Sequence, residues 1–270
     1  MRVLFFGDVF GKPGRQAVKM AIMKLKREYT PDFIIVNGEN AANGKGITAK
    51  IVQEFFDMEI DAITTGNHAW DNVEGLECFT RHPNVLRPAN YPDDAPVPGS
   101  GVAILTSRHN PYLKLGLVLL MGRVFMDALD CPFSRGKREI AKLREKGIRN
   151  ILVDFHAEAS SEKQAFTYYV EGEVSAVVGT HSHVQTADER VLSGGTAAIT
   201  DVGMSGCFDS VIGVRKEIAI RKFVTKMPAR FEPAEGPGGY GAVIIDIDEK
   251  TGKATAIHRF REEVIKWEGL

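Results

Sequence analysis

Five apolar runs of strand length recur along the chain, and each is followed by side chains that commonly bind metals. The runs and their polar successors are VLFFG at 3–7 with Asp8, FIIVNG at 33–38 with Glu39 and Asn40, AITTG at 62–66 with Asn67 and His68, NILVDF at 150–155 with His156, and AVVGT at 176–180 with His181 and His183. Such runs predict buried strands. Because open α/β sheets gather polar groups at one edge, we expect these side chains to converge. Carboxylates, amides and imidazoles in this number predict a site for two metal ions.

Helical segments separate the first three apolar runs. Residues 15–28 carry apolar side chains on one face, which predicts an amphipathic helix that ends near Pro31. After the glycine-rich loop ANGKGI, Thr48 is the expected N-cap of a second helix. This β-α-β-α-β order predicts parallel strands joined by helices. Residues 82–101, rich in proline, glycine and asparagine, are expected to form a long surface loop.

The apolar runs in the rest of the chain predict more strands than one sheet would hold. We expect a hairpin of strands at 102–106 and 115–122, irregular residues at 123–136, a helix at 137–147, a helix from about Ser160, and strands near 174–179, 196–201, 241–247 and 254–260. The glycine-rich and charged residues 203–240 receive no assignment. This order favours an α/β protein with two packed sheets flanked by helices. No repeat or low-complexity linker interrupts the sequence, so residues 1–270 are expected to form a single domain.

Composition narrows the range of partners and compartments. The 34 basic and 35 acidic residues leave a formal net charge of −1, which does not favour binding to extended nucleic acid. The longest strongly apolar run, at 115–122, is far shorter than the roughly 20 residues of a membrane span, so no membrane segment is expected. Only three cysteines occur, widely spaced and without a CxxC motif. This favours a reducing cytoplasm over a disulfide framework.

Each candidate residue has an ordinary structural explanation when it is taken alone. Asp8 could form a turn, and the amides around Glu39 could satisfy their own loop backbone. His68 could be a structural histidine, and Asp71 could either orient it or cap a helix. The HxH spacing at 181–183 favours ligands, because alternate residues at a strand end point to one face. Ligand-type residues at five separate strand ends together favour a metal site over five unrelated structural roles.

Several of these motifs resemble those of the calcineurin-like metallophosphoesterases: GD at 7–8, GNH at 66–68, the lone His156 and GTHSH at 179–183. The chain departs from the usual pattern of that family in two places. Phe10 stands where the family has the histidine of D-x-H, and NGEN at 37–40 replaces its aspartate motif. With these departures, GDVFGKPGR, NGENAANGKGIT, VDFHAEASSEK and VGTHSHVQTAD resemble the YmdB-like branch, which contains bacterial cyclic-nucleotide phosphodiesterases.

The YmdB-like resemblance implies a four-layer α-β-β-α sandwich, the calcineurin-like metallophosphoesterase fold, with two divalent metal ions, typically iron or manganese. Carried onto this sequence, the resemblance assigns one ion to Asp8, Glu39, Asn40 and His183, and the other to Glu39, Asn67, His156 and His181. Glu39 would bridge the two ions, and Asn40 would supply the coordination that Phe10 cannot. His68 would be the general acid. The implied substrates are small phosphodiesters, with 2′,3′-cyclic nucleotides as the first expectation.

The expected reaction is attack on phosphorus by a hydroxide that bridges the two metal ions, while His68 gives a proton to the departing ribose oxygen. The same site would serve a phosphomonoesterase, a 3′,5′-cyclic nucleotide enzyme or a small nuclease. A metal-stabilised regulatory or interaction protein with incidental hydrolysis is the alternative from another class. Lys12, Arg15 and Lys45 could contact phosphate, or their glycine-rich segments could simply form tight turns. Residues 122–133 could form a substrate wall or a subunit contact. The sequence is compatible with a homo-oligomer.

Overall fold

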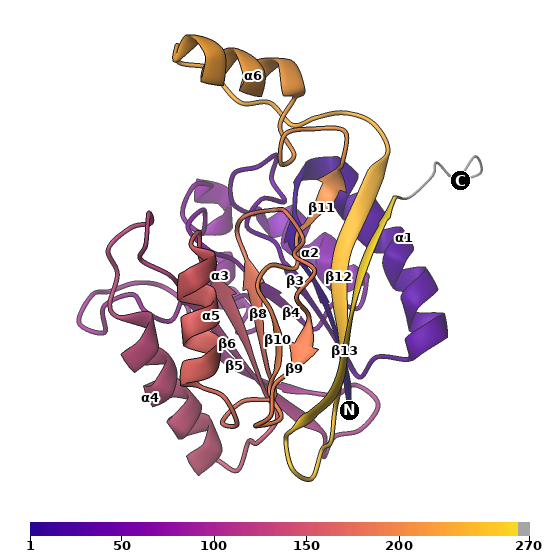
Figure 1. Cartoon of the computed structure of the whole chain (residues 1–270), viewed down its shortest axis with the longest axis vertical. Helices are drawn as coiled ribbons and strands as arrows, with labels where there is room; N and C mark the ends of the chain where they lie inside the picture. Colours follow the sequence, from indigo (N-terminus) through magenta and orange to yellow (C-terminus); the bar gives the residue numbers. More distant parts are fainter. Residues whose placement is uncertain (264–270) are drawn as a thin grey trace.

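The computed structural model describes residues 1–263 as two β-sheets with helices packed against them (Figure 1). The strands are β1 (Arg2–Phe6), β2 (Asp8–Val9), β3 (Phe33–Asn37), β4 (Ala62–Thr64), β5 (Val102–Thr106), β6 (Lys114–Met121), β7 (Ile151–His156), β8 (Ala176–Thr180), β9 (Arg190–Val191), β10 (Ala197–Ile199), β11 (Met204–Cys207), β12 (Gly238–Ile247) and β13 (Ala254–Glu263). The helices are α1 (Gly11–Tyr29), α2 (Ala49–Asp57), the short 3₁₀ helix η1 (Val73–Gly75), α3 (Cys78–Arg81), α4 (Pro132–Glu145), α5 (Ser160–Tyr169) and α6 (Lys216–Thr225). The last residues of the predicted domain, 264–270, lie outside this described part.

The first sheet has seven strands in the order β2-β11-β12-β1-β3-β4, with β13 beside β12. β1 pairs in parallel with β3, and β3 pairs in parallel with β4. Their carboxyl ends therefore lie at the same edge of the sheet. Asp8, Glu39 and Asn67 follow these three ends, which brings them to that edge as the sequence predicts.

The second sheet has six strands in the order β5-β6-β7-β8-β10-β9. Its four inner strands are parallel, and the short edge strands β5 and β9 run antiparallel to their neighbours. Met121 pairs with His156, and His156 pairs with Thr180, so β6, β7 and β8 end at the same level. The predicted hairpin of β5 and β6 is confirmed.

Successive side chains of β1 point to opposite faces of the first sheet, and both of these faces are buried. Val3 and Phe5 belong to a cluster that also contains side chains of β6, so this core lies between the two sheets. Leu4 and Phe6 belong to a second cluster, formed with apolar side chains of α1 and α2. β6 alternates in the same way, and its other face packs against α4 and α5. Figure 1 shows α4 and α5 on one side of the molecule and α1 on the other.

Two helices begin earlier than the sequence predicts. α1 begins at Gly11 rather than near residue 15, so the segment GKPGR is its first turn and not a separate loop. α4 begins at Pro132 rather than at residue 137. Proline fits the first turn of a helix because the amide hydrogens there have no helical acceptor. In both cases, proline marks the start of a helix and does not exclude one.

The expected surface loop at 82–101 is partly interior, which corrects the sequence prediction. Val85 is 1% exposed and forms a backbone bridge with Ile63 of β4. Farther along, Ala89 donates its backbone N–H to the carbonyl of Leu119 in β6 at 2.7 Å. The segment therefore links the edge of one sheet to the other sheet. The irregular chain can be buried at Val85 and Ala89 because neighbouring strands satisfy its backbone polar groups there.

Several smaller features complete the description of the fold. The hydroxyl of Thr48 accepts a hydrogen bond from the backbone N–H of Ile51 at 3.3 Å, which confirms the predicted N-cap. The unassigned segment 203–240 contains β11, α6 and the start of β12. All three cysteines are free thiols. Within residues 1–263, no helix is both long and apolar enough to cross a membrane.

Candidate metal centre

All seven predicted ligands lie together where strands of both sheets end. They are Asp8, Glu39, Asn40, Asn67, His156, His181 and His183. Hydrogen bonds and ion pairs join them into one connected network. Most of the network is closed to solvent, since Asp8, Glu39, Asn40 and His156 are at most 3% exposed. The strand ends therefore converge as the sequence predicts.

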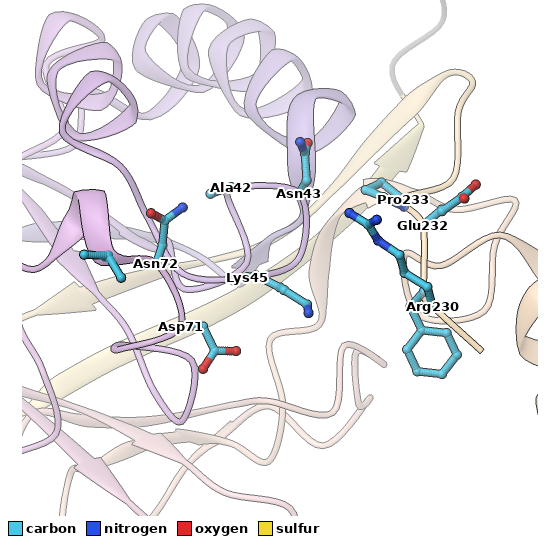
Figure 2. Close-up of a pocket in the computed structure, with 10 residues that line it drawn as sticks. Ala42, Asn43, Lys45, Asp71, Asn72, Arg230, Glu232 and Pro233 are labelled. Atoms are coloured by element: carbon cyan, nitrogen blue, oxygen red, sulfur yellow. The ribbon is translucent and has the colours of Figure 1, made fainter. Parts of the chain in front are cut away.

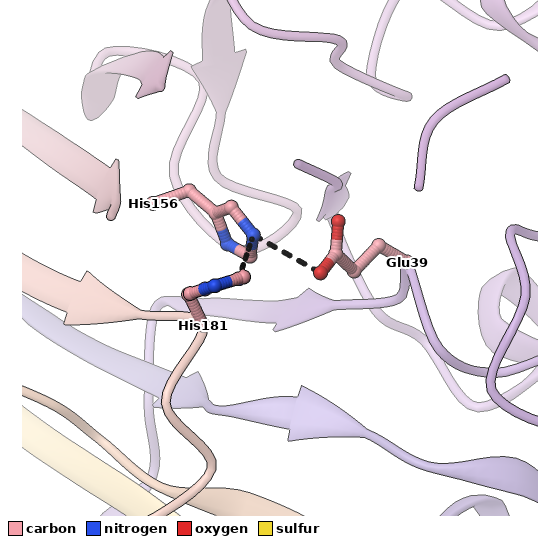
Figure 3. A group of neighbouring side chains, drawn as sticks. All are labelled: Glu39, His156 and His181. Carbon is pink, nitrogen blue, oxygen red and sulfur yellow. Dashed lines mark hydrogen bonds and ion pairs between the residues drawn. The ribbon is translucent and has the colours of Figure 1, made fainter. Parts of the chain in front are cut away.

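One group of side chains surrounds His156 at the end of β7. Its Nε2 atom lies 3.0 Å from Glu39 Oε1, 2.9 Å from Asn67 Oδ1 and 3.1 Å from His181 Nδ1. Figure 3 shows Glu39 and His181 both facing this ring nitrogen. Potential ligand atoms of Glu39, His156 and His181 all lie within 4.8 Å of one another. Three ligand atoms this close together can share one metal ion.

A second group lies around His183 and Asp8. His183 Nε2 is 3.2 Å from Asn40 Nδ2 and 3.7 Å from Asp8 Oδ1. The other ring nitrogen, Nδ1, is 2.9 Å from the backbone carbonyl of Ile212, and donating to that oxygen leaves Nε2 free to face the site. Asn40 Nδ2 also donates to Glu39 Oε1 at 3.3 Å. Glu39 therefore touches both groups.

Burial and charge together set the protonation of the site. Burial opposes ionisation of Glu39, but the adjacent His156 outweighs it and lowers the pKa of Glu39 to about 2. Burial also opposes a charge on His156, yet Glu39, Asp8 and Asp154 raise the pKa of His156 to about 9. For His181, burial and the charge of His156 lower the pKa to about 3. His181 is therefore neutral near pH 7, with a nitrogen lone pair available to a metal.

Two further features show that a cation fits this network. Burial raises the pKa of Asp8 above its usual value, and among residues 1–263 its Oδ1 atom is buried without a hydrogen-bond partner. Burying a carboxylate oxygen without a hydrogen-bond partner costs free energy, and a bound cation would compensate for that cost. Gly66 lies against the same centre, where an added Cβ would be 2.2 Å from the His156 ring and 2.4 Å from Glu39 Oε2. Glycine at this position therefore lets the two ligand-type side chains approach the end of β4.

His68 lies at the rim of the network and not within it. Its backbone N–H donates to Glu39 Oε2 at 3.1 Å, while its side chain is 35% exposed. Nδ1 of the ring is 2.8 Å from Asp71 Oδ2. Asp71 therefore orients His68, which is one of the two roles considered from the sequence. This geometry leaves Nε2 available to a substrate.

The sequence profile of the YmdB-like protein family matches residues 4–260 of this chain. The chain belongs to the YmdB-like family. The 2′,3′-cyclic-nucleotide 2′-phosphodiesterase of Bacillus subtilis strain 168 is 48% identical over 259 residues, which are 96% of each chain. A crystal structure of a phosphatase from Mycoplasma pneumoniae superposes with a TM-score of 0.90 at 33% identity, over 97% of this chain and 93% of that one.

A second solved structure, of a hypothetical protein from Thermus thermophilus, has a TM-score of 0.88 at 39% identity and covers 97% of this chain and 99% of its own. The predicted resemblance is thus confirmed. The mixed α/β fold with two sheets is confirmed as well. The names of the relatives, a phosphodiesterase and a phosphatase, confirm the prediction of a phosphoesterase enzyme.

Phe10 packs against two glycine-containing segments beside the centre. An added Cβ on Gly44 would lie 2.7 Å from the Phe10 ring, and one on Gly213 would lie 2.6 Å from it. The ring also meets His183 edge to face, with centroids 5.7 Å apart. Phe10 therefore holds the loop after β3 and the segment before α6 against the metal centre.

The histidines of GTHSH lie in a turn after β8. The angle φ is 100° at His181 and 65° at His183, in the left-handed region that side chains seldom adopt. Asp8 Oδ2 accepts from the N–H of His181 at 3.0 Å, and Asp201 Oδ2 accepts from the N–H and hydroxyl of Ser182 at 3.1 and 2.7 Å. The explanation by strand alternation is therefore wrong, because β8 ends before these residues. The two imidazoles instead serve different groups of the centre.

Asp154 is a buried residue behind the centre that the sequence analysis did not select. Its carboxylate accepts hydrogen bonds from Thr180 Oγ1 at 2.7 Å and from Thr64 Oγ1 at 2.6 Å. Thr180 Oγ1 also lies 2.9 Å from His156 Nδ1. These contacts orient His156 so that Nε2 faces the other ligand-type residues. The sequence does contain a signal for Asp154, because a charged residue inside the apolar run NILVDF is rarely buried without a specific partner.

Residues 122–131 follow β6 directly beside His156. Gly122 donates its N–H to the carbonyl of His156 at 2.9 Å. The carboxylate of Glu162, at the start of α5, accepts from the N–H groups of Arg123 and Val124 at 3.0 and 3.2 Å. These contacts fix the segment beside the end of β7 and the start of α5.

Lys163 provides a test of how the turn at 181–183 is supported. Its ammonium group is 2.6 Å from Asp201 Oδ2, and both side chains are at most 3% exposed. Lys163→Met would leave Asp201 buried without its counter-charge, so we expect denaturant unfolding to show a loss of about 3–5 kcal/mol. Lys50→Met, on the exposed surface of α2, should change stability by less than about 0.5 kcal/mol. Equal stability of the two variants would contradict this account of the turn.

Proposed function

We propose that this chain is a metal-dependent phosphodiesterase that hydrolyses small cyclic nucleotides, with 2′,3′-cyclic nucleotides as its principal substrates. One observation carries the proposal: the buried carboxylate of Glu39 contacts both His156 and Asn40, and so joins the two groups of ligand-type residues. The named activity of the B. subtilis relative supports the substrate class.

Two divalent metal ions fit the two groups of side chains, with iron or manganese favoured by the mixture of oxygen and imidazole donors. Asp8, Glu39, Asn40 and His183 would hold one ion, and Glu39, Asn67, His156 and His181 would hold the other. When bound, such ions lower the pKa of water and neutralise charge on phosphoryl oxygens. The chain shields part of this donor set from water, because Asp8, Glu39, Asn40 and His156 are buried.

His68 is the proposed general acid. It is not among the side chains that close around Glu39, but its backbone N–H donates to Glu39 Oε2 and so fixes it beside the reaction centre. With Nδ1 donating to Asp71, the imidazolium form of His68 has its second proton on Nε2, and this is the proton that would pass to the leaving oxygen. A histidine in this position contributes about 10²–10⁴-fold to such a reaction. A purely regulatory metal protein needs no proton donor here, which favours catalysis.

The wider architecture belongs to the same proposal. Three apolar clusters, one between the sheets and one under each group of helices, support a four-layer α-β-β-α sandwich. Both sheets contribute to one metal centre, which supports a single domain over residues 1–270. Three free thiols agree with a reducing cytoplasm.

A panel of substrates tests the proposed activity. Metal-loaded protein should hydrolyse 2′,3′-cyclic AMP with a higher kcat/KM than 3′,5′-cyclic AMP, p-nitrophenyl phosphate or a short oligonucleotide. Chromatography should show 3′-AMP as the product if the bond to the 2′ oxygen breaks. Faster hydrolysis of the phosphomonoester or the oligonucleotide would favour the competing phosphoesterase activities instead.

His68→Ala tests the assignment of the general acid. We expect kcat on 2′,3′-cyclic AMP to fall by about 10²-fold or more while metal content, measured by elemental analysis, stays that of the unmodified protein. A substrate with a good leaving group, such as bis-p-nitrophenyl phosphate, should lose much less activity because its leaving oxygen needs no proton. His82→Ala, at a histidine beside Phe56 and away from the centre, is the matched control. Loss of metal in His68→Ala would instead identify His68 as a ligand.

A further inference from the structure

A cavity of about 660 Å³ opens beside the metal centre (Figure 2). Three segments line it: residues 42–45 after β3, residues 71–73 after His68, and residues 230–233 after α6. Its volume is in the range of pockets that bind small organic ligands. None of the seven predicted metal ligands lines this cavity, so it is a separate feature.

The cavity is joined to the proposed reaction centre through Asp71. This residue lines the cavity and also holds the ring of His68 through the 2.8 Å contact to Nδ1. His68 is the proposed proton donor to the leaving oxygen, which in a cyclic nucleotide belongs to the ribose. Because Asp71 lines the cavity and also contacts His68, the cavity adjoins the residue that would face the ribose. It can therefore receive the remaining substituents of the sugar.

Of the four charged residues that line the cavity, the two acidic ones each contact another side chain. Asp71 is engaged with His68, and Glu232 is paired with Arg215 at 3.1 Å. By contrast, Lys45 and Arg230 form no ion pair within residues 1–263. Figure 2 shows the two cationic side chains on opposite sides of the cavity. Two unpaired cations facing one space favour an anionic group between them.

Lys45 and Arg15 are both candidates for phosphate contact from the sequence, but only Lys45 is free of side-chain partners among residues 1–263. Arg15 donates to the carbonyl of Ala41 at 2.6 Å and pairs with Glu54 at 2.9 Å, so it supports the loop between β3 and α2. Lys45 emerges from that same loop into the cavity. The loop therefore has one basic residue that fixes it and one that is available to a ligand.

We infer that Lys45 and Arg230 bind a second phosphate of the substrate, attached to the 5′ oxygen of the ribose whose cyclic phosphate lies at the metal centre. The inference rests on the proposed phosphodiesterase function and narrows its substrate to cyclic phosphates that are also 5′-phosphorylated. Phe231, 44% exposed, lies in the cavity wall, with the ammonium group of Lys222 4.3 Å from its ring centroid; its other face is the one that a base could contact. The 5′ phosphate could be terminal, or it could be the internucleotide phosphate before the cyclic end of an RNA fragment.

Steady-state kinetics on three substrates tests this inference. Adenosine 2′,3′-cyclic phosphate is compared with its 5′-phosphorylated form and with a dinucleotide that ends in the same cyclic phosphate. We expect each substrate with the second phosphate to have a kcat/KM at least about tenfold higher, and the advantage to shrink as salt is raised. A larger gain for the dinucleotide identifies an RNA end as the source, and a larger gain for the 5′-monophosphate identifies a mononucleotide.

The double variant Lys45→Ala/Arg230→Ala should reduce that advantage to about twofold or less. Lys50→Ala/Arg221→Ala removes the same charge from exposed positions outside the cavity and should retain the full advantage. A ratio near one in the unmodified protein, with clear turnover of all three substrates, would overturn this inference and leave the proposed function intact. No turnover of any of them would overturn the proposed function.

A binding measurement keeps the two proposals separate. Calorimetry on the metal-loaded protein compares 3′-AMP with adenosine 3′,5′-bisphosphate, so it does not depend on turnover. We expect the bisphosphate to bind at least about tenfold more tightly, and the double variant Lys45→Ala/Arg230→Ala to lose this difference. Equal affinities in the unmodified protein would contradict a second phosphate site whatever the enzyme hydrolyses.

Discussion

The contact of one buried carboxylate with both halves of the centre is the interaction on which the rest of this structure depends. Glu39 is 1% exposed, and burying its charge is costly unless positive charge and hydrogen bonds compensate. Within the chain, His156 and the backbone of His68 provide part of that compensation. Metal ions on either side of the carboxylate would complete it, which is why the proposed chemistry is centred on this residue.

The fold brings distant segments to this point by ending parallel strands at one level. Contacts across the centre join residues 143 positions apart, from Asn40 to His183, and 173 positions apart, from Asp8 to His181. Two sheets packed through a common apolar core fix the relative positions of these strand ends. Loops and turns then set the directions of the ligand-type side chains. The positive φ angles of His181 and His183 persist because the buried carboxylates of Asp8 and Asp201 accept hydrogen bonds from the backbone of this turn.

The strands could be predicted from the sequence, with the ligand-type residues placed at or just past their ends, because both signals are local. Apolar runs followed by carboxylate, amide or imidazole groups are visible without any knowledge of tertiary contacts. The supporting residues were harder to find: Lys163 and Asp201 acquire their role only through a contact between α5 and the chain after β10. The burial of Val85 likewise depends on a neighbouring strand. Local pattern identified the chemical groups, whereas their support depends on residues far away in the chain.

The most direct test of a carboxylate shared by two cations is a crystal structure of the fully manganese-loaded protein with anomalous diffraction data. The account predicts two anomalous peaks roughly 3.5–4 Å apart, with one oxygen of Glu39 or each of its two oxygens bound to the ions. His183 should lie on one ion and His156 with His181 on the other. A single peak at full loading, or two peaks of which only one contacts Glu39, would contradict it.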